Sequence, residues 1–256
     1  MKYLSPAKIN LFFRVLGKRK DGYHEIASLY QAIDLYDELF ISDSAQEALT
    51  ASDPELLCDE TNLVWKARRL FRAQFGGRSC HIHLEKKIPM QAGLGGGSSN
   101  AATTLWALNE QNGRPATEWQ LLELAAKLGS DVPFFFSSGT AYCTGRGEKL
   151  EPYSLPAPLS GWIVKPPFGL STPAVYQETR VSELPQRDPQ DALIPYNDLE
   201  PAAFRLEPRL FLIKRDGFTM TGSGTAFFTF QSEKPHLEEG FIVPFRSLQR
   251  PLHSWY

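Results

Sequence analysis

Four glycines within residues 89–103, PMQAGLGGGSSNAAT, limit the fold more than any other feature of the sequence. They follow a strand-like segment, Cys80 to Glu85, and precede a segment with apolar residues at helical spacing. Glycine can adopt positive φ and has no Cβ, so the N–H groups of such a loop can approach an anion closely. The four glycines are Gly93, Gly95, Gly96 and Gly97. Ser98 and Ser99 then stand at the expected helix N-terminus, where unpaired amides and the helix dipole favour phosphate.

Two common phosphate motifs do not match this loop. The Walker A pattern requires a lysine after its last glycine, and none follows Gly97. The dinucleotide fingerprint requires a third glycine where this chain has Asn100. The segment therefore predicts a different kind of nucleotide loop. The alternative is a flexible turn without a ligand.

The remaining sequence predicts alternating strands and helices. Expected strands are 3–16, 80–85, 161–165 and a pair within 217–230; expected helices are 61–75, one from Ser98 to about 112, 117–128, and two starting near 173 and 198. Proline-rich stretches at 152–158 and 185–195 are typical of connections. We therefore expect an α+β fold with two lobes, residues 1–155 and 156–256.

Charge and composition exclude several classes of function. Lys plus Arg number 27 against 29 Asp plus Glu, with no long basic run, so we expect no nucleic-acid partner. No apolar stretch reaches the roughly 20 residues that span a bilayer, so we expect a cytoplasmic protein without a membrane partner. The three cysteines are widely spaced and are expected to be reduced thiols. His81 and His83 share one strand face but lack an evident third metal ligand.

Polar residues elsewhere are candidates for chemistry. Asp131 follows Gly129-Ser130 and precedes the apolar run 132–136, where a partly desolvated carboxylate can accept a proton, although an Asp at this position can also simply form a turn. Lys8 lies on the strand face opposite Ile9 and Leu11, facing either a cleft or solvent, and Asn10 shares its face.

The glycine loop resembles the phosphate loop of the GHMP kinases, which include galactokinase and the homoserine, mevalonate and phosphomevalonate kinases. Four further segments resemble a branch of that superfamily that phosphorylates a cytidine diphosphate-linked methylerythritol. They are PAKINL at 6–11, DGYHE at 21–25, GSDVPFF at 129–135 and TGSG at 221–224. The resemblance covers about residues 5 to 230 and implies a two-lobe α+β fold with ATP bound between the lobes.

The resemblance implies a role for each matching residue. Asp131 is the expected catalytic base, and Lys8 is the expected second catalytic residue, pairing with Asp131 and with phosphate charge. The expected ATP-binding residues are Asn62, Leu63, Lys86, Gly93, Leu94, Gly95, Gly96, Gly97, Ser98, Ser99, Gly222, Ser223 and Gly224. The expected substrate-binding residues are Asn10, Tyr23, His24, Thr172 and Tyr176, with the rings of Tyr23 and Tyr176 enclosing a cytosine.

The implied reaction is ATP-dependent phosphorylation of the C2 hydroxyl of this substrate, in the non-mevalonate route to isoprenoids. Mg²⁺ is expected to arrive with ATP, its protein ligands are not evident from sequence, and either a monomer or a homodimer is compatible with the sequence. The alternatives are another GHMP kinase, of homoserine or mevalonate type, and a non-catalytic ligand-binding relative. Two departures from the family pattern stand out: Gln91 replaces the first glycine of the loop, and the region between Asn197 and Gly217 is short.

Overall fold

The computed structural model describes residues 1–185, 195–251 and 253–256. The expected connection at 185–195 therefore lies almost entirely outside the described residues. Among the helices of the described chain, none combines the length and the apolar character needed to cross a membrane.

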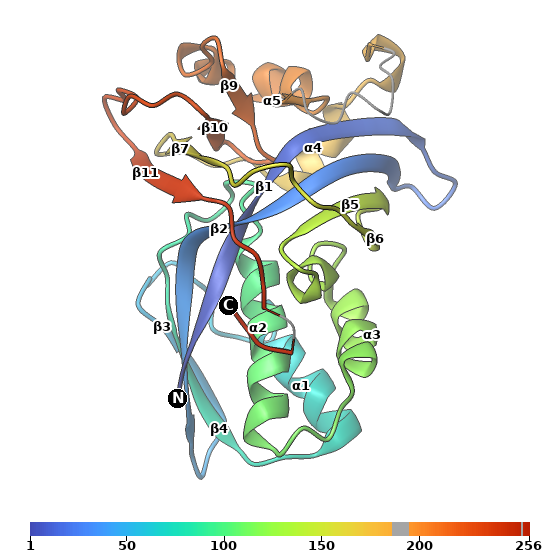
Figure 1. The fold of residues 1–256 in the computed structure, drawn as a ribbon, viewed down its shortest axis with the longest axis vertical. Coiled ribbons are helices and arrows are strands. Elements are labelled where there is room, and N and C mark those ends of the chain that lie inside the picture. Colours follow the sequence, from blue (N-terminus) through green and yellow to red (C-terminus); the bar gives the residue numbers. More distant parts are fainter. Residues whose placement is uncertain (186–194, 252) are drawn as a thin grey trace.

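The two longest strands pair with each other at the centre of the fold. β1 (Lys2–Lys18) pairs antiparallel with β2 (His24–Asp43), and both run through the two halves of the molecule (Figure 1). The pairing shifts register at three places, one of them between Asn10 and Phe12. Such bulges bend a strand and increase its twist. Residues 5–13 are all buried, so the expected alternation of buried and exposed faces is absent here because both faces of the strand are covered.

The lower half in Figure 1 packs helices against one sheet. The sheet order is β3-β4-β2-β1-β8, with β5 pairing β2 and β6 pairing β5. Its remaining strands are β3 (Ala48–Ala51), β4 (Cys80–Glu85), β5 (Thr140–Gly145), β6 (Lys149–Pro152) and β8 (Tyr196–Asn197). The helices are α1 (Leu63–Phe75), α2 (Gly96–Gln111) and α3 (Glu118–Leu128).

The upper half holds a second sheet, of order β11-β7-β10-β9. Its strands are β7 (Ser160–Lys165), β9 (Phe218–Met220), β10 (Phe227–Thr229) and β11 (Phe241–Arg246). Two short helices lie beside it, α4 (Thr172–Glu178) and α5 (Glu200–Leu206). The expected strands at 161–165 and 217–230 are thus confirmed. The helix expected near 198 spans only seven residues.

Capping residues mark the positions where the three longer helices begin. Asn62 caps α1 by accepting a hydrogen bond from the amide of Val64 at 2.9 Å. Thr117 and Gln120 form a capping box at the start of α3, where a helix was expected. α2 begins at Gly96, two residues before the expected start, because Gly95 adopts a left-handed conformation (φ 69°) as its N-cap.

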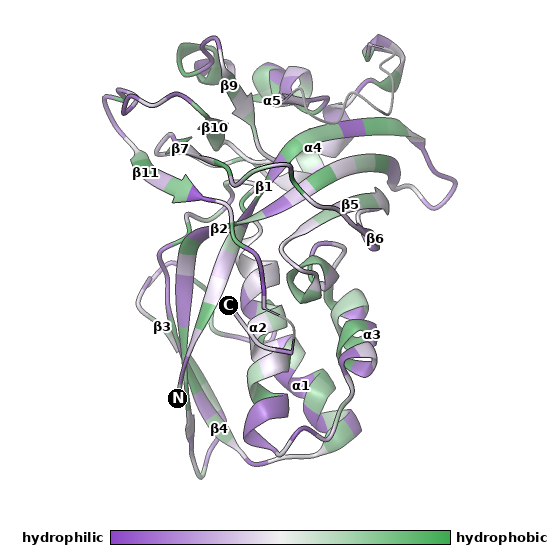
Figure 2. Cartoon of the chain, viewed as in Figure 1, coloured by the Kyte–Doolittle hydropathy of each residue, from purple (hydrophilic) through white to green (hydrophobic). Residues whose placement is uncertain are grey.

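Buried apolar residues form three clusters, from the helical half through the middle to the upper sheet. Figure 2 shows hydrophobic residues along the upper parts of β1 and β2, where the two halves meet. The C-terminal segment returns to the lower half, where Trp255 stacks on Trp106 with ring centroids 5.4 Å apart. Contacts therefore cross the lobe boundary expected near residue 155, and that boundary stays a prediction.

Candidate active site

A cleft of about 960 Å³ lies between the two halves. It is lined by the glycine loop, by the start of α1 and by residues of the upper half. The predicted site residues that line it are Lys8, Asn62, Leu63, Lys86, Gly93, Leu94, Gly95, Gly96, Gly97, Ser98, Asp131, Thr172, Tyr176, Gly222 and Ser223. A single cavity therefore collects most of the residues that the sequence singled out.

The glycine loop is fixed by backbone contacts. The Lys8 amide donates to the Leu94 carbonyl at 2.9 Å, and the Ala226 amide donates to the Ala92 carbonyl at 3.2 Å. A Cβ at Gly95 would lie 2.9 Å from Cγ of Lys8, so glycine here lets the loop pack on the lysine side chain. The amides at the start of α2 border the cleft and suit phosphate oxygens.

The turn at 221–224 packs against this loop at backbone distance. A Cβ on Gly224 would lie 1.9 Å from the Ala92 carbonyl carbon, and a Cβ on Gly93 would lie 2.0 Å from the Thr221 carbonyl oxygen. These two glycines therefore permit contact between loops from the two halves. Gly224 itself is not among the residues that line the cleft, whereas Gly222 and Ser223 are.

Asp37, which the sequence analysis did not single out, ties both ends of the loop together. Its fully buried carboxylate accepts bonds from the amides of Lys87 (2.7 Å) and Ile88 (2.8 Å), before the loop. It also accepts from Nδ2 of Asn100, in the first turns of α2, at 2.9 Å, and from Nζ of Lys86 at 2.7 Å. Three acidic residues lie within 34–38, and the sequence has no signal to show which of them is buried.

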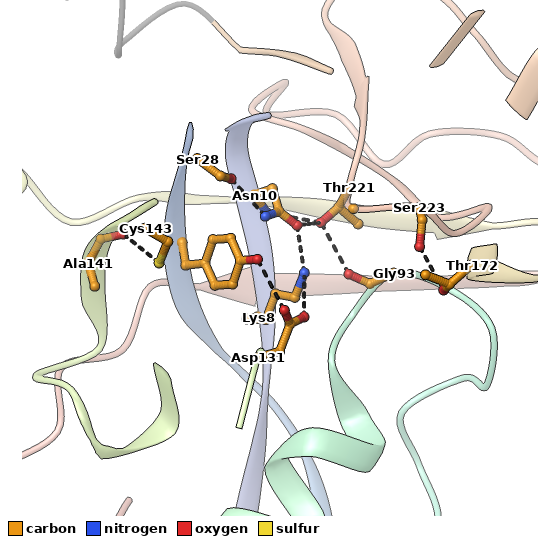
Figure 3. Close-up of polar contacts among 12 residues, drawn as sticks. Lys8, Asn10, Ser28, Gly93, Asp131, Ala141, Cys143, Thr172, Thr221 and Ser223 are labelled. Carbon is orange, nitrogen blue, oxygen red and sulfur yellow. Dashed lines mark hydrogen bonds and ion pairs between the residues drawn. The ribbon is translucent and has the colours of Figure 1, made fainter. Parts of the chain in front are cut away.

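Lys8 and Asp131 form an ion pair at the cleft. Nζ of Lys8 lies 3.5 Å from Oδ2 of Asp131, and the two side chains are 3% and 30% exposed (Figure 3). The carboxylate can thus meet a ligand while the ammonium stays buried. The sequence left open whether Lys8 faces solvent, and the structure places it in the interior, under Gly95.

Asn10 connects this pair to the rest of the site. Its Oδ1 accepts a hydrogen bond from Nζ of Lys8 at 2.6 Å, and its Nδ2 donates to Oγ of Ser28 at 2.9 Å (Figure 3). Its backbone amide donates to Oγ1 of Thr221 at 2.9 Å. Asn10 is fully buried, so the structure places it behind Lys8 and not on the cleft surface.

Local structure at the end of α3 positions Asp131. The helix ends where the Gly129 amide donates to the Ala125 carbonyl at 3.3 Å. The 3-10 turn Pro133–Phe136 follows, and its three phenylalanines are buried. Asp131 therefore stands on a short segment anchored on both sides, which restricts the motion of its carboxylate.

An aromatic cluster lies beside the cleft and reaches its lining through Tyr176. His24 of β2 and Tyr176 of α4 are stacked with ring centroids 5.3 Å apart. Burial lowers the pKa of His24 below its usual value, and the charge of Lys18 adds to this, so the neutral imidazole is favoured. Tyr23 is 56% exposed and its ring lies 4.9 Å from the Arg146 guanidinium.

Two cleft residues have properties that the sequence did not reveal. Gln91 adopts φ 53°, in the left-handed region that glycine enters readily, so its backbone has a conformation that suits the glycine of the family pattern. A Cβ on Gly169 would lie 2.4 Å from Oε1 of Gln91, which places this side chain against the upper half. Lys165 is buried and donates to the carbonyls of Pro166 (2.8 Å) and Phe168 (3.0 Å), and burial lowers its pKa.

The predicted site residues that do not line the cleft are Asn10, Tyr23, His24, Ser99 and Gly224. Ser99 is buried and its hydroxyl accepts from Oγ of Ser5 at 2.8 Å. Thr172 and Ser223, both at the cleft, have hydroxyls 2.8 Å apart.

Within the described chain no group of three or more His, Cys, Asp or Glu side chains can hold a metal ion; His81 and His83 both contact the Thr50 hydroxyl. The three cysteines are free thiols.

Comparisons with known proteins identify the family of this chain. Residues 62–139 match the model of the GHMP kinases N terminal domain. The 4-diphosphocytidyl-2-C-methyl-D-erythritol kinase of Protochlamydia amoebophila is 46% identical, over 100% of this chain and 93% of that protein. The chain belongs to the 4-diphosphocytidyl-2-C-methyl-D-erythritol kinase family.

Further relatives of this kinase family support the same assignment. The chloroplastic enzyme of Arabidopsis thaliana is 38% identical over 100% of this chain and 76% of its own length. A crystal structure of a 4-(cytidine 5'-diphospho)-2C-methyl-D-erythritol kinase superposes with a TM-score of 0.82 at 33% identity, covering 97% of this chain and 99% of that one. A mevalonate kinase structure, at 15% identity and a TM-score of 0.68 over 97% and 99% of the two chains, shares the fold. The two-lobe GHMP kinase fold is thus confirmed.

Proposed function

We propose that this protein uses ATP to phosphorylate the C2 hydroxyl of 4-diphosphocytidyl-2-C-methyl-D-erythritol, in the cytoplasm, as a step of the non-mevalonate route to isoprenoid precursors. The observation that carries the proposal is the Lys8–Asp131 ion pair, which lies in the same cleft as the glycine loop. A proton acceptor and a phosphate cradle in one cavity are what phosphoryl transfer to an alcohol requires.

Asp131 and Lys8 have different chemical tasks. The Asp131 carboxylate accepts the proton of the attacking hydroxyl, and general-base catalysis of this kind contributes about 10²–10⁴-fold to a rate. The Lys8 ammonium, 3.5 Å from that carboxylate, offsets the negative charge that gathers on the transferring phosphoryl group. Asn10 holds the ammonium in place through its 2.6 Å hydrogen bond.

ATP fits the glycine loop on chemical grounds. The amides of Gly96, Gly97 and Ser98 belong to the first turn of α2, where they lack helical partners and border the cleft. Asn62, Leu63 and Lys86 line the same cavity and would contact the adenosine part. Magnesium would neutralise part of the triphosphate charge and would arrive bound to ATP, whose oxygens are its natural ligands.

The aromatic cluster suits the cytidine end of the substrate. Tyr176 and His24 supply stacking surface, His24 adds the nitrogens of its imidazole, and Tyr23 is next to His24 in the chain. A homoserine or a mevalonate would not need such a cluster. This favours the cytidine-linked substrate over those of other GHMP kinases.

A substrate panel tests the proposal. The purified protein is incubated with Mg-ATP and, in separate reactions, with 4-diphosphocytidyl-2-C-methyl-D-erythritol, homoserine or mevalonate, and products are followed by ³¹P NMR. We expect a new phosphate monoester, with stoichiometric ADP, only from the cytidine-linked alcohol. Equal or faster turnover of homoserine or mevalonate would contradict the proposal, and so would the absence of any product.

A further inference from the structure

Tyr30 of β2 contacts the catalytic pair and is among the residues that line the cleft, and no function has been assigned to it. It is 2% exposed, and its hydroxyl donates a hydrogen bond to Oδ1 of Asp131 at 3.1 Å. Nζ of Lys8 lies 4.7 Å from the centroid of the same ring. One side chain therefore contacts both members of the pair.

The two oxygens of Asp131 have different partners. Oδ1 accepts from Tyr30, whereas Oδ2 faces Lys8 at 3.5 Å. A carboxylate with one donor could rotate about its terminal bond, because that torsion is soft. The second donor removes this freedom and fixes which oxygen faces the ammonium.

The ring of Tyr30 also restricts Lys8. An ammonium over an aromatic face is attracted by the ring quadrupole, and the attraction grows when both groups are desolvated. Lys8 is 3% exposed and receives this contact in addition to its hydrogen bond to Asn10. The position of the ammonium is therefore determined by two neighbours as well as by Asp131.

Tyrosine is not needed at this position to fill space. The ring packs edge-on against Phe134, with centroids 5.3 Å apart, and a phenylalanine would make the same apolar contact. The hydroxyl adds the bond to Asp131, and it packs close to Gly147, where an added Cβ would lie 3.0 Å from the hydroxyl oxygen. Burial, reinforced by the charge of Asp131, raises the pKa of Tyr30 well above its usual value, so the phenol remains a donor.

We propose that Tyr30 is a positioning residue for phosphoryl transfer, which holds the Asp131 carboxylate and the Lys8 ammonium in the arrangement that the reaction uses. This inference rests on the proposed function, because it assigns Asp131 and Lys8 the roles given there. It adds a residue that acts on the reaction through its contacts with both members of the pair.

The kinetic test compares Tyr30→Phe with Tyr142→Phe. Tyr142 is a phenol on the adjoining strand β5 that packs on Phe12, with centroids 6.1 Å apart, and serves as the matched control. We expect kcat of Tyr30→Phe to fall about 5- to 50-fold, because a misplaced catalytic group loses part of its contribution. KM for ATP and for the alcohol should stay within about twofold, as expected for a group that acts on chemistry and not on binding.

Tyr142→Phe should retain kcat within about twofold, and both variants should melt within a few degrees of the wild type. A folded Tyr30→Phe with kcat and both KM values unchanged would overturn the proposal. A rise in KM with unchanged kcat would overturn it too, since it would indicate a binding role.

Crystal structures of the wild type and of Tyr30→Phe provide a readout that does not depend on turnover. We expect the Asp131 carboxylate of the variant to rotate or to occupy two orientations. If the wild type fails to phosphorylate the cytidine-linked alcohol, the proposed function fails, and these structures still test the positioning role. If the Asp131 side chain has the same single orientation in both proteins, the positioning role of Tyr30 is wrong.

Discussion

The side chain of Asp131 combines an accessible oxygen with a buried cationic neighbour. Asp131→Asn keeps its shape but removes the charge and the ability to accept a proton. We expect kcat to fall by about 10²-fold or more, while KM for ATP and for the alcohol change little. Steady-state kinetics with a thermal-melt control measures this. If the folded variant kept more than about a third of wild-type kcat, Asp131 would be a turn-forming residue and not the base.

The stacked imidazole of His24 makes stability depend on pH in a defined direction. Because its folded-state pKa lies below the usual value of 6.5, the unfolded chain binds the proton more readily. The contribution of neutral His24 to the free energy of unfolding is complete above about pH 6.5, and it is lost as the pH falls towards the lowered folded-state pKa. We therefore expect Tm to drop more between pH 7.5 and 5.5 in the wild type than in His24→Gln. Equal drops in the two proteins would contradict this assignment.

At the scale of elements, the glycine loop packs so closely on its neighbours that a side chain at Gly96 does not fit without displacing them. A Cβ at Gly96 would lie 3.1 Å from Cγ2 of Ile88 and 3.2 Å from Nζ of Lys86, so the larger side chain of Gly96→Val must displace one of them. We expect affinity for a nonhydrolysable ATP analogue to fall at least tenfold, because the amides that meet phosphate shift with the loop. Calorimetric titration measures this loss.

Gly17→Val is the control for that titration. Gly17 lies near the end of β1, and a Cβ there would meet nothing within 4 Å. Its affinity for the analogue should match that of the wild type. If Gly96→Val folds and also binds like the wild type, the loop is not the phosphate site.

At the scale of the whole molecule, the site exists because two halves close around a cleft. Tyr176 of α4 stacks on His24, at the start of β2, where this long strand reaches the upper half. Tyr176→Ala should raise KM for the cytidine-linked alcohol about ten- to a hundredfold, since loss of a stacking plane costs about 1–3 kcal/mol in comparable sites. KM for ATP should hardly change. Equal effects on both substrates would indicate that Tyr176 acts as a core residue.

The sequence by itself determined the features that depend on neighbouring residues. The glycine run, the Thr117–Gln120 capping box and the Gly129 helix end follow from local sterics and local hydrogen bonds. These rules act over a few residues, so a single sequence is enough to apply them. The prediction that Lys8 and Asp131 form a catalytic pair also came from the sequence, but through resemblance to a family.

Only the tertiary structure decided which distant side chains meet. Lys8 pairs with Asp131, and Tyr30 contacts both, because β1 and β2 pair while the end of α3 packs beside them. Asp37 and Tyr30 went unrecognised because nothing in a strand's own sequence tells a buried, bonded polar side chain from an exposed one. The burial of such groups depends on partners from other elements, which supply the hydrogen bonds that compensate for lost water.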